Sequence, residues 1–343
     1  MNGPMIEILT HSYATLCETL KQDYGRGPVE ARAIMRQVWR RGNTRFFEDP
    51  TLAQRPGFAE RLEADIDLSL PEVIDRTQAE DTVKLVFRLA DGERVESVLV
   101  PMAHYTTICV SSQVGCRMGC AFCQTGTLGL VRQLSVSEIV SQIYWAQKVA
   151  GAPIRNVVFM GMGEPLLNTE NVFRTIELLS AKEFLNFSAR RFTISTAGVI
   201  KGINGLIDFN KKVNLAVSLN SPFQKEREKI MPVAKNNPLN SLYIALKKYN
   251  EKCGRFTFEY IILPGVNNSE KHAKAIISLK KDLNFNVNII AYNDFPGAEY
   301  KKCTSKDINA FLSYFKNSNV EAVKRVSKGA DILAACGQLA GKK

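Results

Sequence analysis

Three thiols stand at the spacing C-x3-C-x2-C in the stretch Cys116-Arg117-Met118-Gly119-Cys120-Ala121-Phe122-Cys123. Cysteine thiolates at such short spacings are typical ligands of a cubic iron–sulfur cluster. Three ligands for four irons leave one iron open to a substrate or cofactor. Structural zinc takes four ligands, and none of the His residues (His11, His104 and His272) lies close enough in sequence to complete such a set. We therefore favour a [4Fe–4S] cluster on Cys116, Cys120 and Cys123. The alternatives are zinc with a distant fourth ligand, or buried free cysteines.

Around this loop the sequence alternates between strand-like and helix-like runs. A β-rich run at 106–110 leads into the loop, and further runs lie at 156–160, 191–195, 213–218, 256–263, 287–291 and 320–326. Helical patterns lie between most of them, at 135–149, 170–179, 239–250, 269–281 and 305–315. The first begins with a capping box of Ser135 and Glu138. This alternation predicts an α/β fold with a parallel sheet that forms a full or partial TIM-type (βα) barrel. Its chemistry should lie at the carboxyl ends of the strands.

The region before the barrel has a different pattern. Helical spacing at 5–22, 29–39 and 58–64 predicts a small helical domain, with Trp39, Phe46 and Phe47 in its core. Two β-rich runs, 83–90 and 94–101, flank Asp91-Gly92, which is a strong hairpin signal. We expect four parts: a helical N-terminal domain at 1–75, a β-hairpin linker at 76–101, a barrel at 102–331 and a tail at 332–343.

Composition limits the class of protein. The 343 residues carry a formal net charge of +11, which favours an anionic partner such as RNA, although a basic charge also suits an ordinary soluble protein. The sequence contains no run of 18 apolar residues, so no membrane helix is expected. The first 22 residues lack a signal-peptide pattern. We therefore expect a cytoplasmic protein without a membrane partner. Eight cysteines in such a chain indicate metal binding or catalysis rather than disulfides.

A glycine-rich motif, Met160-Gly161-Met162-Gly163-Glu164-Pro165, follows one predicted strand. Glycines let a backbone approach a ligand closely, and the Glu164 carboxylate could accept hydrogen bonds from the ammonium group of an amino acid. By itself such a turn is more often a plain loop. Here it matches the G-x-G-E-P element of radical S-adenosylmethionine barrels, whose signature is C-x3-C-x2-C.

Over almost its whole length the sequence resembles the family of radical adenine methyltransferases that act on large-subunit ribosomal RNA. The last of the matching blocks is the most specific. The blocks are Cys109-Val110-Ser111-Ser112-Gln113-Val114-Gly115-Cys116, Gly161-Met162-Gly163-Glu164-Pro165-Leu166, Ser195-Thr196-Ala197-Gly198-Val199, Leu263-Pro264-Gly265-Val266-Asn267 and Asp331-Ile332-Leu333-Ala334-Ala335-Cys336-Gly337-Gln338-Leu339.

The resemblance implies a catalytic role for three residues outside the cluster. Carbon 2 of adenine is electron-poor and cannot attack a methyl sulfonium, whereas a thiolate can. Cys336 would take a methyl group from one S-adenosylmethionine, and a second molecule would yield the 5′-deoxyadenosyl radical that activates it. The base would then be tied to Cys336 until Cys109 attacks and forms a transient disulfide, with Glu96 as general base. Without the resemblance, Cys336 and Cys109 would be read as core residues and Glu96 as a solvated side chain. Cys17, Cys253 and Cys303 match no family position and are read as structural or free.

The resemblance also implies a set of S-adenosylmethionine contacts at the ends of successive strands. In this set the family usually has His where this chain has Asn220. Asp294, which follows the last contact, also departs from the common residue. The contacts are Gly163, Glu164, Ser195, Ser218, Leu219, Asn220 and Asn293.

The implied partners are ribosomal RNA, transfer RNA and an electron donor of flavodoxin type. Basic pairs at Arg190-Arg191, Lys211-Lys212 and Lys301-Lys302 could hold phosphates, although each is more typical of a solvated surface. Two alternatives stay open. One is methylation at carbon 8, as in related antibiotic-resistance enzymes, and the other is a non-catalytic RNA-binding protein with a structural metal.

Overall fold

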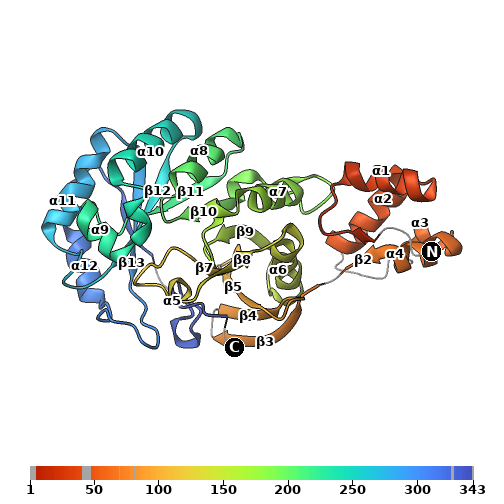
Figure 1. Cartoon of the computed structure of the whole chain (residues 1–343), viewed down its shortest axis with the longest axis horizontal. Coiled ribbons are helices and arrows are strands. Elements are labelled where there is room, and N and C mark those ends of the chain that lie inside the picture. The colour runs from red at the N-terminus through yellow and green to blue at the C-terminus, as the bar shows by residue number, and fades with distance from the viewer. Residues whose placement is uncertain (1–4, 41–47, 69, 80–81, 326–327, 342–343) are drawn as a thin grey trace.

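The computed structural model describes residues 5–40, 48–68, 70–79, 82–325 and 328–341. Phe46, Phe47 and Val326, which the sequence analysis assigned to the core and to a strand, lie outside these residues. A sheet of ten strands dominates the larger lobe, and a smaller helical lobe adjoins it (Figure 1). The strand order in this sheet is β14-β13-β12-β11-β10-β9-β6-β5-β4-β3, and the two edge strands do not pair with each other.

Seven neighbouring strands are parallel, as predicted, and they form the open barrel. They are β6 (Thr106–Cys109), β9 (Ile154–Phe159), β10 (Phe192–Thr196), β11 (Asn214–Ser218), β12 (Phe256–Ile262), β13 (Phe285–Ala291) and β14 (Ala322–Arg325). The helices that connect them lie on the outer side of the curved sheet (Figure 1). These are α6 (Val136–Val149), α7 (Thr169–Ser180), α8 (Ile200–Asp208), α9 (Gln224–Ile230), α10 (Leu239–Cys253), α11 (Glu270–Ser278) and α12 (Ser305–Ser313). Short 3-10 turns are η3 (Pro165–Leu167), η4 (Ala189–Arg191), η5 (Pro232–Lys235), η6 (Leu279–Lys281) and η7 (Ala330–Ile332).

Alternation along each strand separates the core from the inside of the barrel. On β12, Phe258 and Tyr260 are fully buried, and the Tyr260 ring stacks on Phe311 of α12. Between them Glu259 points to the inner side, where it shares a small polar cavity with Thr257. The outer face therefore carries the hydrophobic core, and the inner face offers polar groups.

Three antiparallel strands extend the sheet beyond β6. They are β5 (Arg94–Pro101), β4 (Thr82–Arg88) and β3 (Glu72–Ala79). The predicted hairpin is present, with Gly92 in the left-handed region at φ +85°. β3 was not expected, because its sequence is mostly polar, and the boundary proposed at residue 75 falls inside it.

The smaller lobe is helical. It contains α1 (Tyr13–Tyr24), α2 (Pro28–Met35), a π-helix (Arg36–Arg40), α3 (Pro50–Ala53) and α4 (Pro56–Asp65). The helix expected from residue 5 begins only at Tyr13, because Ser12 caps it and β1 (Ile6–Glu7) pairs instead with β2 (Ile66–Asp67). Trp39 is buried as predicted and packs against Tyr144 and Phe184 of the larger lobe, so a shared apolar cluster joins the two lobes.

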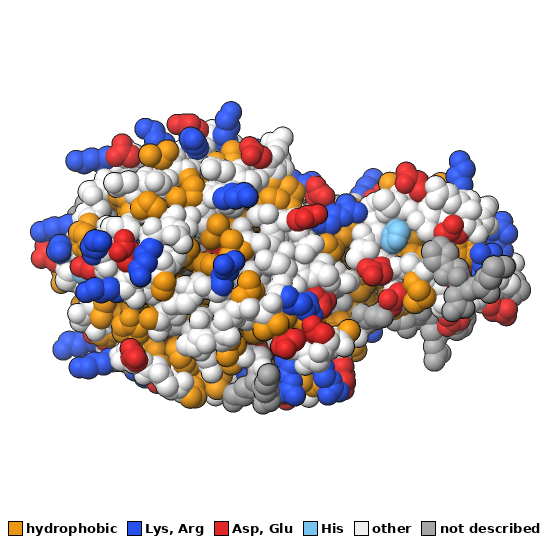
Figure 2. All heavy atoms as spheres, in the orientation of Figure 1, with side chains coloured by type: hydrophobic (Ala, Val, Ile, Leu, Met, Phe, Trp, Pro, Cys, Tyr) orange, Lys and Arg blue, Asp and Glu red, His pale blue; other side chains and the backbone are white. Residues whose placement is uncertain are grey.

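A separate hairpin holds the cysteine loop. Its strands are β7 (Gln113–Cys116) and β8 (Gly129–Gln133), with the short helix α5 (Gln124–Thr127) between them. In Figure 2, Lys and Arg side chains are spread over the larger lobe among acidic ones. Among the described residues, no helix has the length and apolar character needed to cross a membrane.

Candidate active site

The cysteine loop begins where β7 ends. Cys116 is the last residue of β7, and the loop then turns through Gly119, whose φ of +61° suits glycine. The Cys123 N–H donates to the Cys120 carbonyl at 3.1 Å, and a Cβ at Gly126 would come within 3.0 Å of the Cys120 backbone. The chain is therefore folded tightly around the three thiols.

Burial and mutual repulsion disfavour the thiolate form of all three cysteines. Burial raises the pKa of Cys116 to about 12. It also raises the pKa of Cys120 and Cys123, and the neighbouring thiols add to the rise at Cys120. Within the described part of the chain, no three Cys, His, Asp or Glu side chains converge on one point as ligands of a single ion. Three thiols in one loop whose surroundings disfavour the free thiolate are a donor set that bound iron would stabilise, so the residues fit an iron–sulfur cluster.

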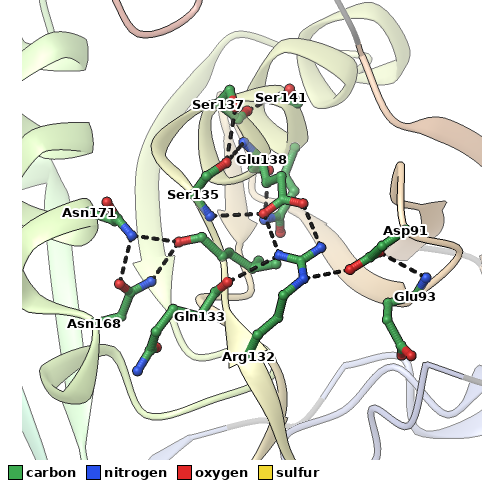
Figure 3. Close-up of polar contacts among 12 residues, drawn as sticks. Asp91, Glu93, Arg132, Gln133, Ser135, Ser137, Glu138, Ser141, Asn168 and Asn171 are labelled. Carbon is green, nitrogen blue, oxygen red and sulfur yellow. Dashed lines mark hydrogen bonds and ion pairs between the residues drawn. The ribbon is translucent and has the colours of Figure 1, made fainter.

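A polar network anchors the hairpin that carries the loop (Figure 3). Arg132 of β8 pairs through two nitrogens with Glu138 of α6, at 2.8 and 2.9 Å, and its Nε lies 2.6 Å from Asp91 of the β4–β5 turn. Glu138 and Asp91 raise the pKa of Arg132. Glu138 also accepts from the Ser135 N–H, which confirms the predicted capping box. One cation thus joins the cysteine hairpin to the β4–β5 hairpin and to a barrel helix.

The glycine-rich motif after β9 packs directly against the approach to the cysteine loop. A Cβ at Gly161 would lie 2.7 Å from the Val110 carbonyl, and one at Gly163 would lie 2.5 Å from Gln113 Cβ. The Glu164 carboxylate accepts from the N–H groups of Leu166 at 3.1 Å and Ala197 at 2.7 Å. Burial raises the pKa of Glu164 to about 7. Its carboxylate therefore bridges the ends of β9 and β10 as well as facing the site.

The other expected cofactor residues follow β10 and β11. Ser195 and Ser218 are partly exposed near the carboxyl ends of these strands. Leu219 is buried, and its N–H donates to the Glu259 carbonyl at 3.0 Å. The Asn220 side chain accepts from the Ile261 N–H at 2.8 Å and is fully buried. At this position the side chain therefore fastens two strands together.

Arg227 of α9 was missed by the sequence analysis. It donates to the carbonyls of Ala197, Ser218 and Leu219 at 2.6 to 3.0 Å, and burial lowers its pKa to about 10. These hydrogen bonds hold the ends of β10 and β11 together, close to Cys120. No signal marked it, because it lies in a polar helix that reads as solvent-exposed.

The segment at 334–341 lies against the cysteine loop (Figure 1). The Gln124 N–H donates to the Gly337 carbonyl at 2.7 Å, and the Thr125 hydroxyl donates to the Leu339 carbonyl at 2.5 Å. From the end of β13, Asn293 Nδ2 donates to the Cys336 carbonyl at 3.3 Å. Cys336 is thereby held beside the cysteine loop.

Cys109 and Cys336 line one cavity of about 480 Å³. Both are free thiols in the structure and both are partly exposed. Burial, and then the neighbouring Cys336 sulfur, raise the pKa of Cys109 to about 12. The remaining walls are mostly aliphatic and come from β5, β6, β9, β13 and the tail, with Arg325 as a charged member. They include Val98, Val100, Met102, Thr107, Val158, Met160, Ile290, Lys328, Ala334 and Leu339.

Glu96 lies on β5, two residues before Val98, which lines the cavity. Its side chain is buried, and Oε2 accepts from the Ala340 N–H at 3.2 Å. Glu96 is not among the described residues that line the cavity of Cys109 and Cys336. The structure therefore places it next to the segment that carries Cys336.

The remaining cysteines lie in the two cores, in keeping with a structural reading. Cys17 packs against the core of the smaller lobe, and Cys253 and Cys303 pack against that of the larger one. All eight cysteines are free thiols.

Comparison with known proteins agrees with this geometry. The sequence model of the Radical SAM superfamily matches residues 110–276, from the end of β6 into α11. The dual-specificity RNA methyltransferase RlmN of Geobacter sulfurreducens is 40% identical, over 93% of this chain and 88% of its own. That of Lawsonia intracellularis is 39% identical, over 98% and 96%. A crystal structure of a radical SAM methyltransferase from Sphaerobacter thermophilus superposes with a TM-score of 0.92 at 35% identity, covering 98% of this chain and all of its own.

The fold and the cysteine loop thus define a radical SAM protein, and the expected α/β fold is confirmed. More narrowly, the chain belongs to the RlmN family. Membership of the radical SAM class implies a [4Fe–4S] cluster and S-adenosylmethionine.

Proposed function

We propose that this protein is a radical SAM methyltransferase that methylates carbon 2 of an adenine in large-subunit ribosomal RNA and of an adenine in transfer RNA. The observation that carries the proposal is the shared cavity of Cys109 and Cys336 beside the three-cysteine loop. Two free thiols that face one space can carry a group and then release it. The relatives at about 40% identity are named dual-specificity RNA methyltransferases, which supports two classes of RNA substrate.

In this proposal each sulfur has one task. Cys116, Cys120 and Cys123 would hold the cluster, which when bound supplies the electron for cleaving S-adenosylmethionine. Two molecules of S-adenosylmethionine would be used per turnover, one as the methyl donor and one as the radical source. Gly163, Glu164, Ser195, Ser218, Leu219, Asn220 and Asn293 would position S-adenosylmethionine at the strand ends.

The chain's own residues would then handle the methyl group. The Cys336 sulfur attacks the methyl carbon of S-adenosylmethionine, and the carbon–sulfonium bond breaks with its electron pair staying on the departing sulfur. Cys109 later attacks the Cys336 sulfur and frees the methylated base. Glu96, next to the tail at Ala340, would accept a proton once the base is bound.

The cavity suits a nucleobase. Its walls are largely aliphatic, which favours a flat ring taken out of the RNA stack. A-form grooves are poorly read by side chains, so enzymes that modify bases usually extract them. The proposal includes an electron donor of flavodoxin type. It also includes a cytoplasmic location, where both RNA classes occur.

The test is mass spectrometry of nucleosides from ribosomal and transfer RNA treated anaerobically with the reconstituted protein. We expect 2-methyladenosine from the wild type and none from Cys336→Ala. Finding 8-methyladenosine alone would instead support the carbon-8 reaction of the resistance enzymes. Methylation of RNA by Cys336→Ala would disprove the transfer of the methyl group through the Cys336 sulfur. If the iron-loaded wild type produced no methylated nucleoside, the result would support the alternative of a non-catalytic RNA-binding protein.

A further inference from the structure

Arg325 enters the cavity that holds the two thiols. It is the last residue of β14, and it lines the cavity together with Cys109 and Cys336. Its guanidinium Nη1 lies 3.4 Å from Glu259 Oε2, and Nη1 and Nη2 lie 3.4 and 3.5 Å from Met160 Sδ. The other Glu259 oxygen accepts from Asn288 Nδ2 at 3.0 Å. A buried carboxylate therefore holds the guanidinium at the wall of the cavity that the two thiols share.

The electrostatics of the cavity depend on this cation. The Cys336 sulfur, and then Glu259 and Cys109, raise the pKa of Arg325, so it stays charged. Burial raises the pKa of Cys109 to about 12, and among the neighbouring groups Arg325 opposes that rise. Lys328 also lines the cavity, but its Nζ donates to the Pro101 carbonyl at 3.1 Å.

We propose that Arg325 is a positioning residue whose charge stabilises the Cys109 thiolate as it attacks Cys336, at the step that breaks the protein–RNA adduct. The inference rests on the proposed function, in which Cys109 resolves that adduct. It gives a role to a partly buried ion pair, Arg325–Glu259, that the methyl-transfer scheme does not use.

The step balances as follows. A Cys109 Sγ–Cys336 Sγ bond forms while the bond from Cys336 Sγ to the methylene carbon on the base breaks. The electron pair of that bond goes to the carbon, which takes a proton and becomes the methyl group. The two sulfurs are oxidised to a disulfide as the carbon is reduced. A neutral Cys109 thiol could not start this exchange efficiently, because the thiolate is the nucleophile.

The first experiment measures the thiolate directly and needs no loaded enzyme. In a Cys336→Ala background, Cys109 is alkylated with iodoacetamide under anaerobic conditions, and the rate is followed by peptide mass spectrometry. Arg325→Gln keeps a hydrogen-bonding side chain for Glu259 but removes the charge, and Arg325→Lys restores the charge. The matched control is Arg255→Met, which removes an exposed arginine paired with Glu321 at 3.3 Å.

We expect Arg325→Gln to slow alkylation about 3- to 30-fold. A nearby opposite charge shifts a pKa by about 1 to 3 units, and the lower nucleophilicity of a more acidic thiolate cancels roughly half of each tenfold gain. Arg325→Lys should recover most of the rate, and Arg255→Met should match the parent. An unchanged rate in Arg325→Gln, or an equal loss in Arg325→Lys, would overturn the inference.

The second experiment uses the full reaction. With Cys336 present, Arg325→Gln should accumulate a covalent protein–RNA adduct that the wild type does not retain. If the wild type never carries a methyl group on Cys336, the proposed function fails while the alkylation result stands on its own. If the wild type is methylated and Arg325→Gln releases RNA at the wild-type rate, only the role of Arg325 fails.

Discussion

The reactivity of this site depends on the surroundings of two sulfur atoms, those of Cys109 and Cys336. Cys109 and Cys336 share a cavity, but the fold holds the Cys109 thiol in surroundings that raise its pKa to about 12. Such a thiol is mostly protonated at neutral pH, so it resists stray oxidation and reacts slowly unless its thiolate is stabilised. In the proposed function, these surroundings suit Cys109 as the resolving sulfur, and Cys336 is the carrier.

Replacing Cys109 by Ala should trap the RNA. Without the attacking sulfur, the base stays bound to Cys336, and we expect a stable protein–RNA adduct on a denaturing gel. Peptide mapping should locate the bond at Cys336. Cys253→Ala, at a partly buried cysteine in the barrel core, is the matched control and should release RNA normally. Wild-type turnover by Cys109→Ala would disprove the resolving role.

Glu164 gives stability a definite pH dependence. Its pKa in the folded protein is about 7, raised by burial from 4.5, so between these values the folded state binds more protons than the unfolded state. Its contribution is therefore fully present below about pH 4.5 and is lost as pH rises through about 7. From about pH 5.5 to about pH 8, the free energy of unfolding of wild type should fall roughly 2 kcal/mol more than that of Glu164→Gln.

Urea unfolding without S-adenosylmethionine would measure this difference. The control is Glu170→Gln, which changes an exposed carboxylate on α7 nearby. Its pH profile should parallel that of the wild type. Parallel profiles for Glu164→Gln and wild type would contradict the raised pKa.

At the scale of the element, α8 shows how closely the glycine-rich loop is packed. A Cβ at Gly202 would overlap the Leu166 side chain and lie 2.7 Å from its carbonyl oxygen, next to Glu164. Gly205, one turn later on the same helix, has its nearest neighbour, Phe173, at 3.9 Å. The same substitution should therefore have opposite effects at the two positions.

We expect Gly202→Ala to destabilise the protein by about 1–3 kcal/mol through overpacking. Gly205→Ala should be neutral or stabilising by up to about 1 kcal/mol, because alanine favours a helix. Thermal unfolding of both variants tests this. Equal destabilisation would mean that helix propensity, not the contact with Leu166, controls the position.

Much of the fold could be predicted from the sequence, and particular residues explain what could not. The barrel strands have apolar blocks such as 256–263, and the Asp91-Gly92 turn has its own signature, so both were found. β3 was missed because charged residues such as Asp75 and Arg76 suit a half-exposed edge strand as well as a loop. Arg227 and Arg325 were missed because their value comes from tertiary neighbours, which no local pattern encodes.

In the whole molecule, the three basic pairs lie at different ends of the barrel. Arg190-Arg191 and Lys211-Lys212 precede β10 and β11, so they lie at the amino ends of these strands, opposite the cysteine loop. Lys301-Lys302 follows β13 at the carboxyl end, and Lys302 lies 3.9 Å from Asp294. Of these three pairs, only Lys301-Lys302 lies at the end of the barrel that carries the site, so in the proposed function we expect it to contact RNA.

The double variant Lys301→Gln/Lys302→Gln should bind RNA more weakly and with less dependence on salt. Two lost phosphate contacts would flatten the slope of log affinity against log salt by about 1.4. Lys211→Gln/Lys212→Gln removes the same charge from the far end and should keep the wild-type slope. Filter binding at several salt concentrations distinguishes the two, and the reverse ranking would place the RNA on the other face.

The hydrogen bonds that hold the Cys336 segment link it to the cysteine loop, which oxygen would damage if it removed bound iron. Residues 124 and 125, immediately after the last cysteine of the loop, donate two of the hydrogen bonds that hold 334–341 in place. In the proposed function, loss of iron that loosened this loop would also free Cys336 from the cavity that it shares with Cys109. An enzyme without iron would then lose its methyl carrier as well, and it would stop before forming an RNA adduct that it could not resolve.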